Sequence, residues 1–285
     1  NVDKIVGRCV RSIINQEYNN EINIYLVNDG STDKTLNILN QFSYYKNINI
    51  INHQNNRGLS AARNSGIRAG RSEIICFLDS DMIVNKDWLK IHVSILADNN
   101  VLGVVGDYIL PIGKTQNQLD KYLYNPRRGA RQFGENKAIG FSYFLFSNTS
   151  IKRYAFDSID IFDENINSYG GEDTELAIRL WEKFPDAFRF SSNALSQHYS
   201  NKTMKEFQQS MYHYGKINLP LLLKKYPQHK NNLGGQYIYS IIGYIIFNPI
   251  IRFVIILLNM IINNYWIKRY LIVDAVIRGA RDNKV

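Results

Sequence analysis

The chain has 285 residues, of which 45% are hydrophobic and 21% are charged. These values exclude a disordered protein, and the length allows either one large domain or two small ones. Two cysteines, Cys9 and Cys76, are too few for a disulfide framework, so we expect a reducing compartment.

The net charge of +9 is unevenly distributed. Residues 201–285 carry 12 basic and 3 acidic residues, which accounts for the whole excess and leaves residues 1–200 neutral. We therefore predict a catalytic or binding domain over 1–200 and a basic, apolar, helical region over 201–285 that associates with a surface. The basic region contains no recognisable nucleic-acid motif, so we expect no nucleic-acid partner.

Strands and helices alternate along the first 110 residues. Helical periodicity covers 4–16, 33–42, 59–70 and 85–98, and the apolar runs typical of strands cover 22–29, 47–52, 72–79 and 101–110. This alternation predicts an α/β fold with a mixed, mostly parallel sheet flanked by helices. Ligands bind such sheets at the carboxyl ends of the strands, where Asp29 and Asp79 lie.

The pattern changes after residue 110. Residues 114–140 are polar, contain a basic cluster (Arg127, Arg128 and Arg131) and are predicted to form a mobile loop. A strand over 141–150, a helix over 172–184 and a strand over 188–200 follow, and the stretch 203–227 predicts further helices.

The run ICFLDSDMIV ends in two carboxylates one residue apart, Asp79 and Asp81. In an extended chain both project to one face and repel each other unless a cation lies between them. Mg²⁺ and Mn²⁺ favour carboxylate oxygens and keep positions open for phosphate oxygens. The alternative interpretation is a pair of ordinary loop carboxylates.

Two further acidic turns have structural alternatives. VNDGSTD (27–33) is explained equally well as a turn and helix cap, and YGGEDTEL (169–176) places Glu172 and Asp173 where they can stabilise a helix start. His198 is isolated in the sequence. The other four histidines, at 53, 92, 213 and 229, are expected at surface or helix-face positions.

The order of the motifs is more specific than any one of them. NDGSTD, NNRGLSAARNSGI (55–67), FLDSD, FDE, YGGEDTEL and the downstream His198 together resemble the family 2 glycosyltransferases over about residues 5–200. The resemblance implies the GT-A fold, the Rossmann-like fold of nucleotide-diphospho-sugar transferases. It also implies a metal-dependent, inverting transfer of a hexosyl or N-acetylhexosaminyl group from a UDP-sugar to a glycan or lipid-linked acceptor, in bacterial surface polysaccharide synthesis.

The resemblance also implies roles for individual residues. Asp29, Arg63 and Asp79 match positions that bind the nucleotide sugar. Asp81 and His198 match ligands of Mn²⁺ or Mg²⁺. Asp173 matches the general base, and Glu172 matches a residue that positions the acceptor.

One departure concerns the start of the chain. Family members begin with a strand ending in a Pro-Thr/Ala-Tyr-Asn turn, whereas this sequence starts at the helix that would follow it. We therefore expect the first strand of the catalytic domain to be missing through truncation.

Two other functions compete with glycosyl transfer. A sugar-phosphate nucleotidyltransferase also combines an α/β sheet with metal-binding carboxylates, but it calls for a glycine-rich basic loop near the N-terminus that this sequence lacks. A catalytically inactive nucleotide-sugar-binding or scaffolding relative is the second rival. The presence of Asp79, Asp81, Asp173 and His198 argues against it.

Residues 237–262 are strongly apolar, with Arg252 as their only charge. The stretch is long enough to span a membrane, but Asn248, Pro249 and Arg252 interrupt its middle, so we predict two shorter helices at the membrane surface. The side chains that would suit the interface are Tyr265, Trp266, Lys268 and Arg269. The expected location is peripheral, at the cytoplasmic face of the cell membrane, and the alternative role of this segment is a homodimer interface.

Overall fold

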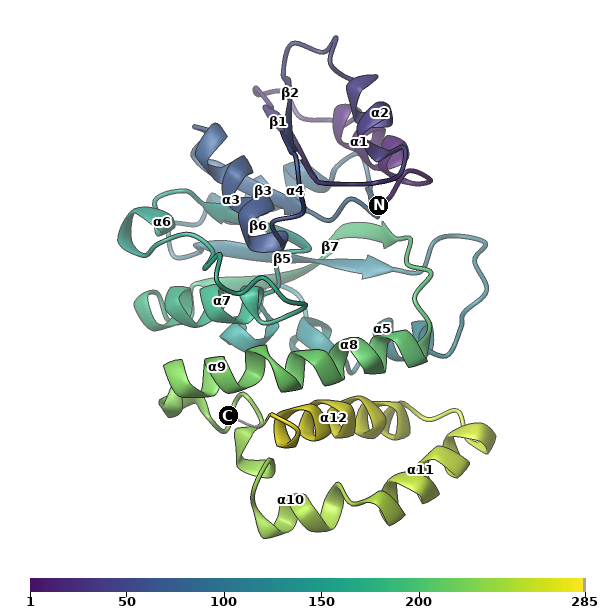
Figure 1. Cartoon of the computed structure of the whole chain (residues 1–285). Coiled ribbons are helices and arrows are strands. Elements are labelled where there is room, and N and C mark those ends of the chain that lie inside the picture. Colours follow the sequence, from purple (N-terminus) through teal and green to yellow (C-terminus); the bar gives the residue numbers. More distant parts are fainter. Residues whose placement is uncertain (284–285) are drawn as a thin grey trace. The chain divides into compact units, whose positions relative to one another are not determined.

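The computed structural model describes residues 1–283, which form two compact units (Figure 1). The first unit contains residues 1–114, 129–167 and 172–200. The second contains 115–128, 168–171 and the chain from 201 onward. Two short segments that were expected within the first domain therefore belong to the second unit.

The first unit contains two sheets. A two-stranded parallel sheet pairs β1 with β2, and a five-stranded sheet has the order β3-β6-β5-β7-β4. The strands are β1 (Ile24–Asp29), β2 (Ile48–His53), β3 (Ile74–Leu78), β4 (Met82–Val84), β5 (Gly103–Ile109), β6 (Asn148–Lys152) and β7 (Phe188–His198).

The mixed α/β class predicted from the sequence is confirmed, but the expectation of mostly parallel strands is wrong. Among the described strands, β1–β2 and β5–β7 are parallel, whereas β3–β6, β5–β6 and β4–β7 are antiparallel. The alternating strand–helix pattern ends at β5. Strand β6 enters only after the long excursion that follows β5, and it inserts between β3 and β5 in the opposite direction.

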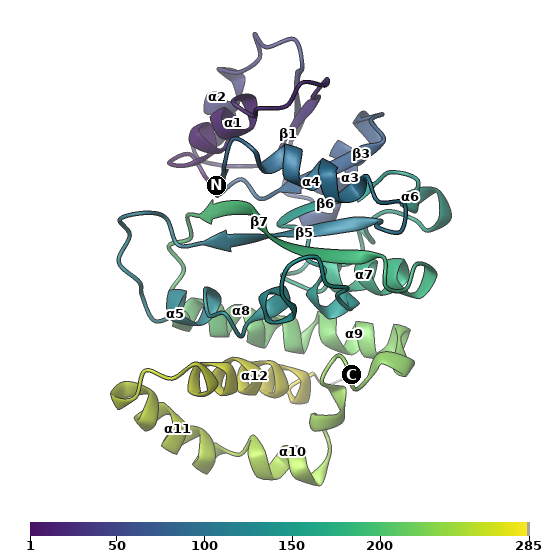
Figure 2. The same cartoon turned by 180° about the vertical axis from the view of Figure 1, so that it is seen from behind.

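Helices cover the five-stranded sheet on two faces. Figures 1 and 2 show α4 and α7 on opposite faces of this sheet, and α1 and α2 beside β1 and β2. The helices of this unit are α1 (Val6–Ile14), α2 (Thr35–Asn40), α3 (Leu59–Ala69), α4 (Trp88–Leu96), α6 (Ala155–Ser158) and α7 (Glu172–Lys183), with short 3₁₀ turns at Gly129–Phe133 and Phe141–Tyr143.

A polar residue organises the buried centre of the sheet. The Asn148 amide donates to the carbonyl oxygens of Asp107 at 2.8 Å and Ala194 at 3.0 Å, and its oxygen accepts from the Trp88 indole at 2.7 Å. These bonds satisfy carbonyls beside the register shift at Gly106/Asp107 in β5. Asn148 thus fixes β5, β6, β7 and α4 together, because an unpaired buried polar group would be costly.

The stretch 114–140 is folded rather than a mobile loop. It contains helix α5 (Asp120–Leu123) and the 3₁₀ turn at 129–133, and Leu119, Tyr122 and Ala130 are buried. The Arg131 guanidinium donates to the Asp107 carboxylate at 2.6 Å, so this member of the basic cluster is paired within its own unit. The polar composition suggested a loop, and the sequence could not indicate these contacts because their partners are distant in sequence.

The second unit is helical. Within it, α12 lies between α8 on one side and α10 and α11 on the other (Figures 1 and 2). Besides α5, its helices are α8 (Met204–Lys216), α9 (Asn218–Lys225), α10 (Ile241–Ile246), α11 (Pro249–Ile261) and α12 (Tyr265–Arg281), with 3₁₀ turns at Pro227–His229 and Gly235–Tyr237. No helix within residues 1–283 is both long and apolar enough to cross a bilayer.

The apolar segment divides into two helices as predicted. The Asn248 side chain accepts from the Ile251 backbone N–H at 2.9 Å, and Pro249 occupies the first turn of α11, so the break follows from an N-cap and a proline. The placement of Lys268 at the surface was wrong. This residue is buried, and its ammonium group donates to the Asn263 side chain at 2.6 Å.

Candidate functional site

A three-residue strand brings the Asp-x-Asp motif to His198. Asp79 follows β3, Asp81 precedes β4, and β4 pairs antiparallel with β7 so that Met82 lies opposite His198. The Tyr199 backbone N–H donates to the Asp81 carbonyl at 2.8 Å, which continues this pairing. As a result, the His198 Nε2 lies 3.3 Å from an Asp81 carboxylate oxygen.

This pair of side chains fits a divalent cation that also binds substrate oxygens. Among the described residues, no group of three or more His, Cys, Asp or Glu side chains is placed to hold a metal ion. One carboxylate and one imidazole suit Mn²⁺, and they leave most coordination positions for phosphate oxygens and water. The donor set is therefore too small for a closed structural site and would suit only an ion that also binds other oxygen ligands.

Arg63 on α3 joins the other acidic residues. Its guanidinium forms an ion pair with Asp173, lies 3.5 Å from an Asp79 oxygen and lies 3.8 Å from a Glu172 oxygen. The Arg63 side chain is only 8% exposed, so it is almost fully enclosed by these carboxylates and by the Phe162 ring. Since an arginine remains charged at all relevant pH values, it compensates three acidic groups that would otherwise repel each other.

Asp173 is fixed from two sides. One carboxylate oxygen pairs with Arg63, and the other accepts from the Phe146 backbone N–H at 3.2 Å. A carboxylate offers about four lone-pair sites, so these contacts orient the group and leave capacity for a substrate hydroxyl. The N-terminal position on α7 further stabilises its negative charge.

Glu172 is a buried acid whose pKa is shifted by its surroundings. Burial and the charge of Asp173 raise the pKa of Glu172 to about 7, although Arg63 opposes the rise. Its Oε2 atom is buried without a hydrogen-bond partner. Loss of hydration similarly raises the pKa of Asp79 to about 6; Arg63 opposes this rise, and the charges of Asp81 and Asp173 add to it.

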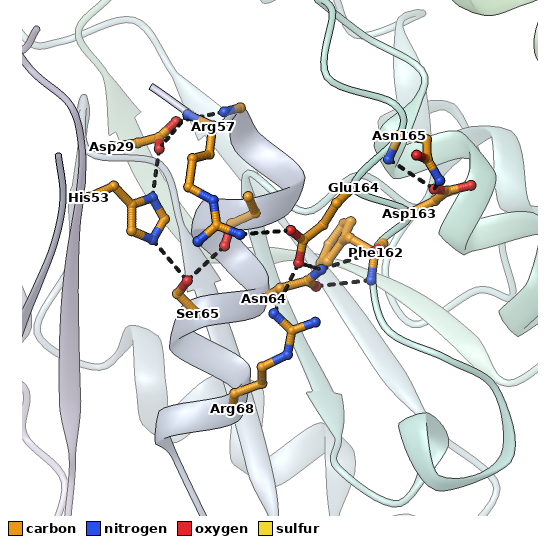
Figure 3. Close-up of polar contacts among 12 residues, drawn as sticks. Asp29, His53, Arg57, Asn64, Ser65, Arg68, Phe162, Asp163, Glu164 and Asn165 are labelled. Atoms are coloured by element: carbon orange, nitrogen blue, oxygen red, sulfur yellow. Dashed lines mark hydrogen bonds and ion pairs between the residues drawn. The ribbon is translucent and has the colours of Figure 1, made fainter. Parts of the chain in front are cut away.

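Asp29 lies in a separate contact group at the end of β1, shown in Figure 3. Its carboxylate accepts from the backbone N–H groups of Arg57 and Gly58, both at 2.9 Å, and contacts His53 Nδ1 at 2.7 Å. These bonds hold the turn after β1 against the loop before α3. Gly30 is required in this turn, because a Cβ there would lie 2.4 Å from the Asn56 backbone nitrogen.

A second group in Figure 3 fixes the orientation of α3. Glu164 accepts from Asn64 at 2.9 Å, Arg68 at 3.0 Å and Arg57 at 3.1 Å. The Asn64 side chain also exchanges hydrogen bonds with the Phe162 backbone. The FDE stretch therefore positions the helix that carries Arg63, a role that its sequence alone did not reveal.

The structure brings most of the sequence-predicted site residues together. Two contacting sets, linked through the two acids of the Asp-x-Asp motif, are Arg63, Asp79, Glu172 and Asp173, and Asp81 with His198. Asp29 bonds instead to the loop over 53–58.

The expectation of a surface or helix-face position was wrong for His53, which ends β2, whereas His92 does lie on a helix, α4, with its side chain buried. His53 is buried against Asp29 and Ser65, and His92 is buried against Ser150 and Asn148. Each of the two rings contacts polar side chains through both nitrogens. These contacts depend on residues distant in sequence, so periodicity could not indicate them.

Comparison with known proteins identifies relatives of this chain. The family model described as "Glycosyl transferase family 2" matches residues 1–159. Glycosyltransferase GlyA of Streptococcus pneumoniae is 28% identical over 190 residues, covering 67% of this chain. The chain spans 24% of GlyA, and it also spans less than half of several other curated relatives.

Solved structures share the fold. The mannosyltransferase PcManGT of Pyrobaculum calidifontis, solved with GDP-Man and Mn²⁺, matches with a TM-score of 0.63 at 15% identity, covering 96% of this chain and 83% of that one. S. aureus TarS (1–349) with UDP-GlcNAc matches with a TM-score of 0.55 at 14% identity, covering 97% and 87%. The fold is therefore that of the GT-A enzymes, and because the family model covers more than half of the sequence, the chain belongs to glycosyl transferase family 2.

Proposed function

We propose that this protein transfers a sugar from a nucleotide sugar to a hydroxyl group of a glycan or lipid-linked acceptor, with inversion at the anomeric carbon. The observation that carries the proposal is the ion pair between Arg63 and Asp173 beside the Asp-x-Asp motif. It places a fixed carboxylate next to residues suited to a metal-bound diphosphate. Family membership favours this activity over that of a nucleotidyltransferase.

The donor side is formed by the turn after β3 and by α3. Arg63 and Asp79 bind the nucleotide sugar in this proposal, and Asp29 contacts the base or ribose. We favour a UDP-sugar, in line with the family resemblance and with the UDP-GlcNAc bound to TarS. PcManGT holds GDP-Man, so the shared fold accepts more than one nucleotide.

Asp81 and His198 would hold Mn²⁺ or Mg²⁺ on the donor side. A divalent ion there stabilises the negative charge that develops on a departing diphosphate. PcManGT, which shares the fold, was solved with Mn²⁺, and this supports a divalent ion as the cofactor.

Asp173 is the general base in this proposal. It accepts the proton of the acceptor hydroxyl while that oxygen attacks the sugar from the face opposite the diphosphate. Glu172 positions the acceptor in this proposal, in line with the family resemblance and with its contact to Arg63 beside Asp173. A base must lie within hydrogen-bond reach of the proton it removes, and the bonds from Arg63 and Phe146 keep Asp173 in one orientation for that step.

Replacing the base tests the proposal. In D173N we expect the transfer rate to fall by about 10²–10⁴-fold, the usual contribution of a general base, while UDP affinity stays within a few-fold of wild type. Transfer is measured with a panel of UDP- and GDP-sugars in the presence of Mn²⁺, and UDP affinity by calorimetry. The control is D157N, which makes the same change at an exposed position.

Two results would contradict these assignments. Undiminished transfer by D173N would show that another group removes the proton. A wild-type protein that binds nucleotide and transfers no sugar from the panel would instead identify an inactive, nucleotide-binding member of the family.

A further inference from the structure

The second unit exposes a continuous set of apolar side chains on α10 and α11. Large apolar residues at twelve positions on these two helices are at least 37% exposed. They are Ile241, Ile242, Tyr244, Ile245, Ile246, Ile250, Phe253, Val254, Ile256, Leu257, Met260 and Ile261. Soluble proteins rarely leave so large an apolar surface open unless it binds a partner or a membrane.

The only charge in the apolar segment is turned inward. The Arg252 Nε donates to an Asp274 carboxylate oxygen at 2.6 Å, and the same oxygen accepts from Arg278 at 3.0 Å. Asp274 lies on α12 and is 1% exposed. Arg252 is therefore neutralised on the side of α11 that faces α12, and the exposed side chains of α11 form an uncharged surface.

Aromatic and basic side chains flank this surface. Arg269 lies over the ring of Trp266, which is 52% exposed, and Arg281 lies over the Tyr244 ring at 4.2 Å from its centroid. Tyrosine and tryptophan with adjacent basic residues are typical of segments at the boundary between lipid and water.

Two observations distinguish a bilayer from a second copy of the chain. Five of the six residues of α10 carry exposed apolar side chains, and the sixth is Gly243. These side chains point in several directions around the helix. A partner protein would cover only one side of such a helix. In addition, residues 201–285 carry 12 basic and 3 acidic residues, so two copies would repel each other. An anionic lipid surface attracts the same charge.

We propose that α10 and α11 lie in the plane of an anionic phospholipid bilayer, with their exposed side chains inserted at the level of the headgroups and upper acyl chains. The Arg252–Asp274 ion pair permits this insertion by removing the one charge that would oppose it. The proposal stands independently of sugar transfer, because it uses no residue of the candidate active site.

Vesicle flotation with the full chain tests the proposal. We expect the wild type to float with phosphatidylcholine vesicles containing phosphatidylglycerol and to bind pure phosphatidylcholine at least ten-fold more weakly. The double variant F253E/M260E should lose at least ten-fold in binding to the anionic vesicles. The matched control Y44E/I112E adds the same charge at exposed apolar positions of the first unit and should bind as the wild type does.

Each other outcome overturns the proposal. Absence of flotation, equal binding to neutral vesicles, or full binding by F253E/M260E would exclude α10 and α11 as an anionic-membrane surface. Sedimentation without vesicles tests the alternative occupant. A wild-type dimer that F253E/M260E converts to a monomer of unchanged helical content would identify a homodimer interface instead.

Discussion

The role of Arg63 was indicated by the sequence, but its contacts were not. Its place in SAARN suggested a nucleotide-pocket residue by resemblance, and nothing in the sequence indicated that it would pair with the acids of YGGEDTEL. The contact joins residues 110 positions apart, and local periodicity carries no information over that separation. The sequence thus indicated the acids and Arg63 as candidate site residues, but it did not indicate the contact between them.

The raised pKa of Glu172 leads to a prediction at the same scale. Because the pKa is about 7 in the folded protein and near 4.5 in the unfolded chain, the folded state binds the proton more tightly. This stability contribution is complete below pH 4.5 and is lost as the pH rises through 7. We expect E172Q, which cannot ionise, to melt at a higher temperature relative to wild type at pH 8 than at pH 5.

Thermal melts at the two pH values, without nucleotide or metal, measure this difference. E73Q removes an exposed carboxylate and should follow the wild type at both pH values. A difference between E172Q and wild type that is the same at pH 5 and pH 8 would mean that Glu172 ionises as an ordinary surface acid.

At the scale of elements, the sequence predicted helices with a long apolar periodicity well. It did not predict elements whose formation depends on pairing with a distant part of the chain. Helices such as α3 and α7 begin and end within about two residues of the predicted ranges. Strand β4 was missed because three residues have no period, and its existence depends on β7 more than 100 residues later. Helix α12 lies within the region predicted to be helical, but its bounds were not predicted, because its buried Lys268 and Asp274 interrupt the apolar periodicity.

Helices α8 and α12 approach each other through glycines. A Cβ on Gly279 would lie 2.0 Å from the Tyr212 carbonyl oxygen, and one on Gly215 would lie 2.1 Å from that of Val276. We expect G279A to push the helices apart and to lower the free energy of unfolding by about 1–3 kcal/mol, the usual effect of overpacking. Denaturant unfolding followed by circular dichroism measures the loss.

Gly140 provides the comparison. A Cβ there meets nothing within 4 Å, so G140A should be neutral or slightly stabilising. Equal stability of G279A and G140A would show that α8 and α12 tolerate a wider separation.

For the whole molecule, composition and charge predicted a change in character near residue 200, and the longest segment of the second unit begins at residue 201. The α/β class followed from the alternating pattern. The strand directions did not, because insertion of β6 between β3 and β5 is a long-range event. The two segments that join the second unit, 115–128 and 168–171, were equally unpredictable for the same reason.

All seven candidate site residues lie in the first unit, which leads to a prediction about ligand binding. We expect UDP with Mn²⁺ at about 100 times its dissociation constant to add about 2.7 kcal/mol of stability, and so to raise the melting temperature of this unit by about 5–10 °C. Chelation of the metal should abolish most of this shift, and D81N should lack it. Differential scanning calorimetry resolves the effect from the second unit, whose transition should not move.

A shift that persists unchanged in chelator and in D81N would mean that nucleotide binds without a metal at Asp81. In that case the contact between Asp81 and His198 would have a purely structural role.

The ion pair between Arg252 and Asp274 also limits how this chain can change over generations. A substitution that removes Asp274 leaves the charge of Arg252 uncompensated within an apolar segment. One that removes Arg252 leaves the buried carboxylate of Asp274 paired with Arg278 alone. Loss of Asp274 is therefore the more harmful single replacement, because it deprives both Arg252 and Arg278 of this carboxylate, whereas loss of Arg252 leaves Asp274 paired with Arg278. Sequences that descend from this one should lose Asp274 less readily than Arg252.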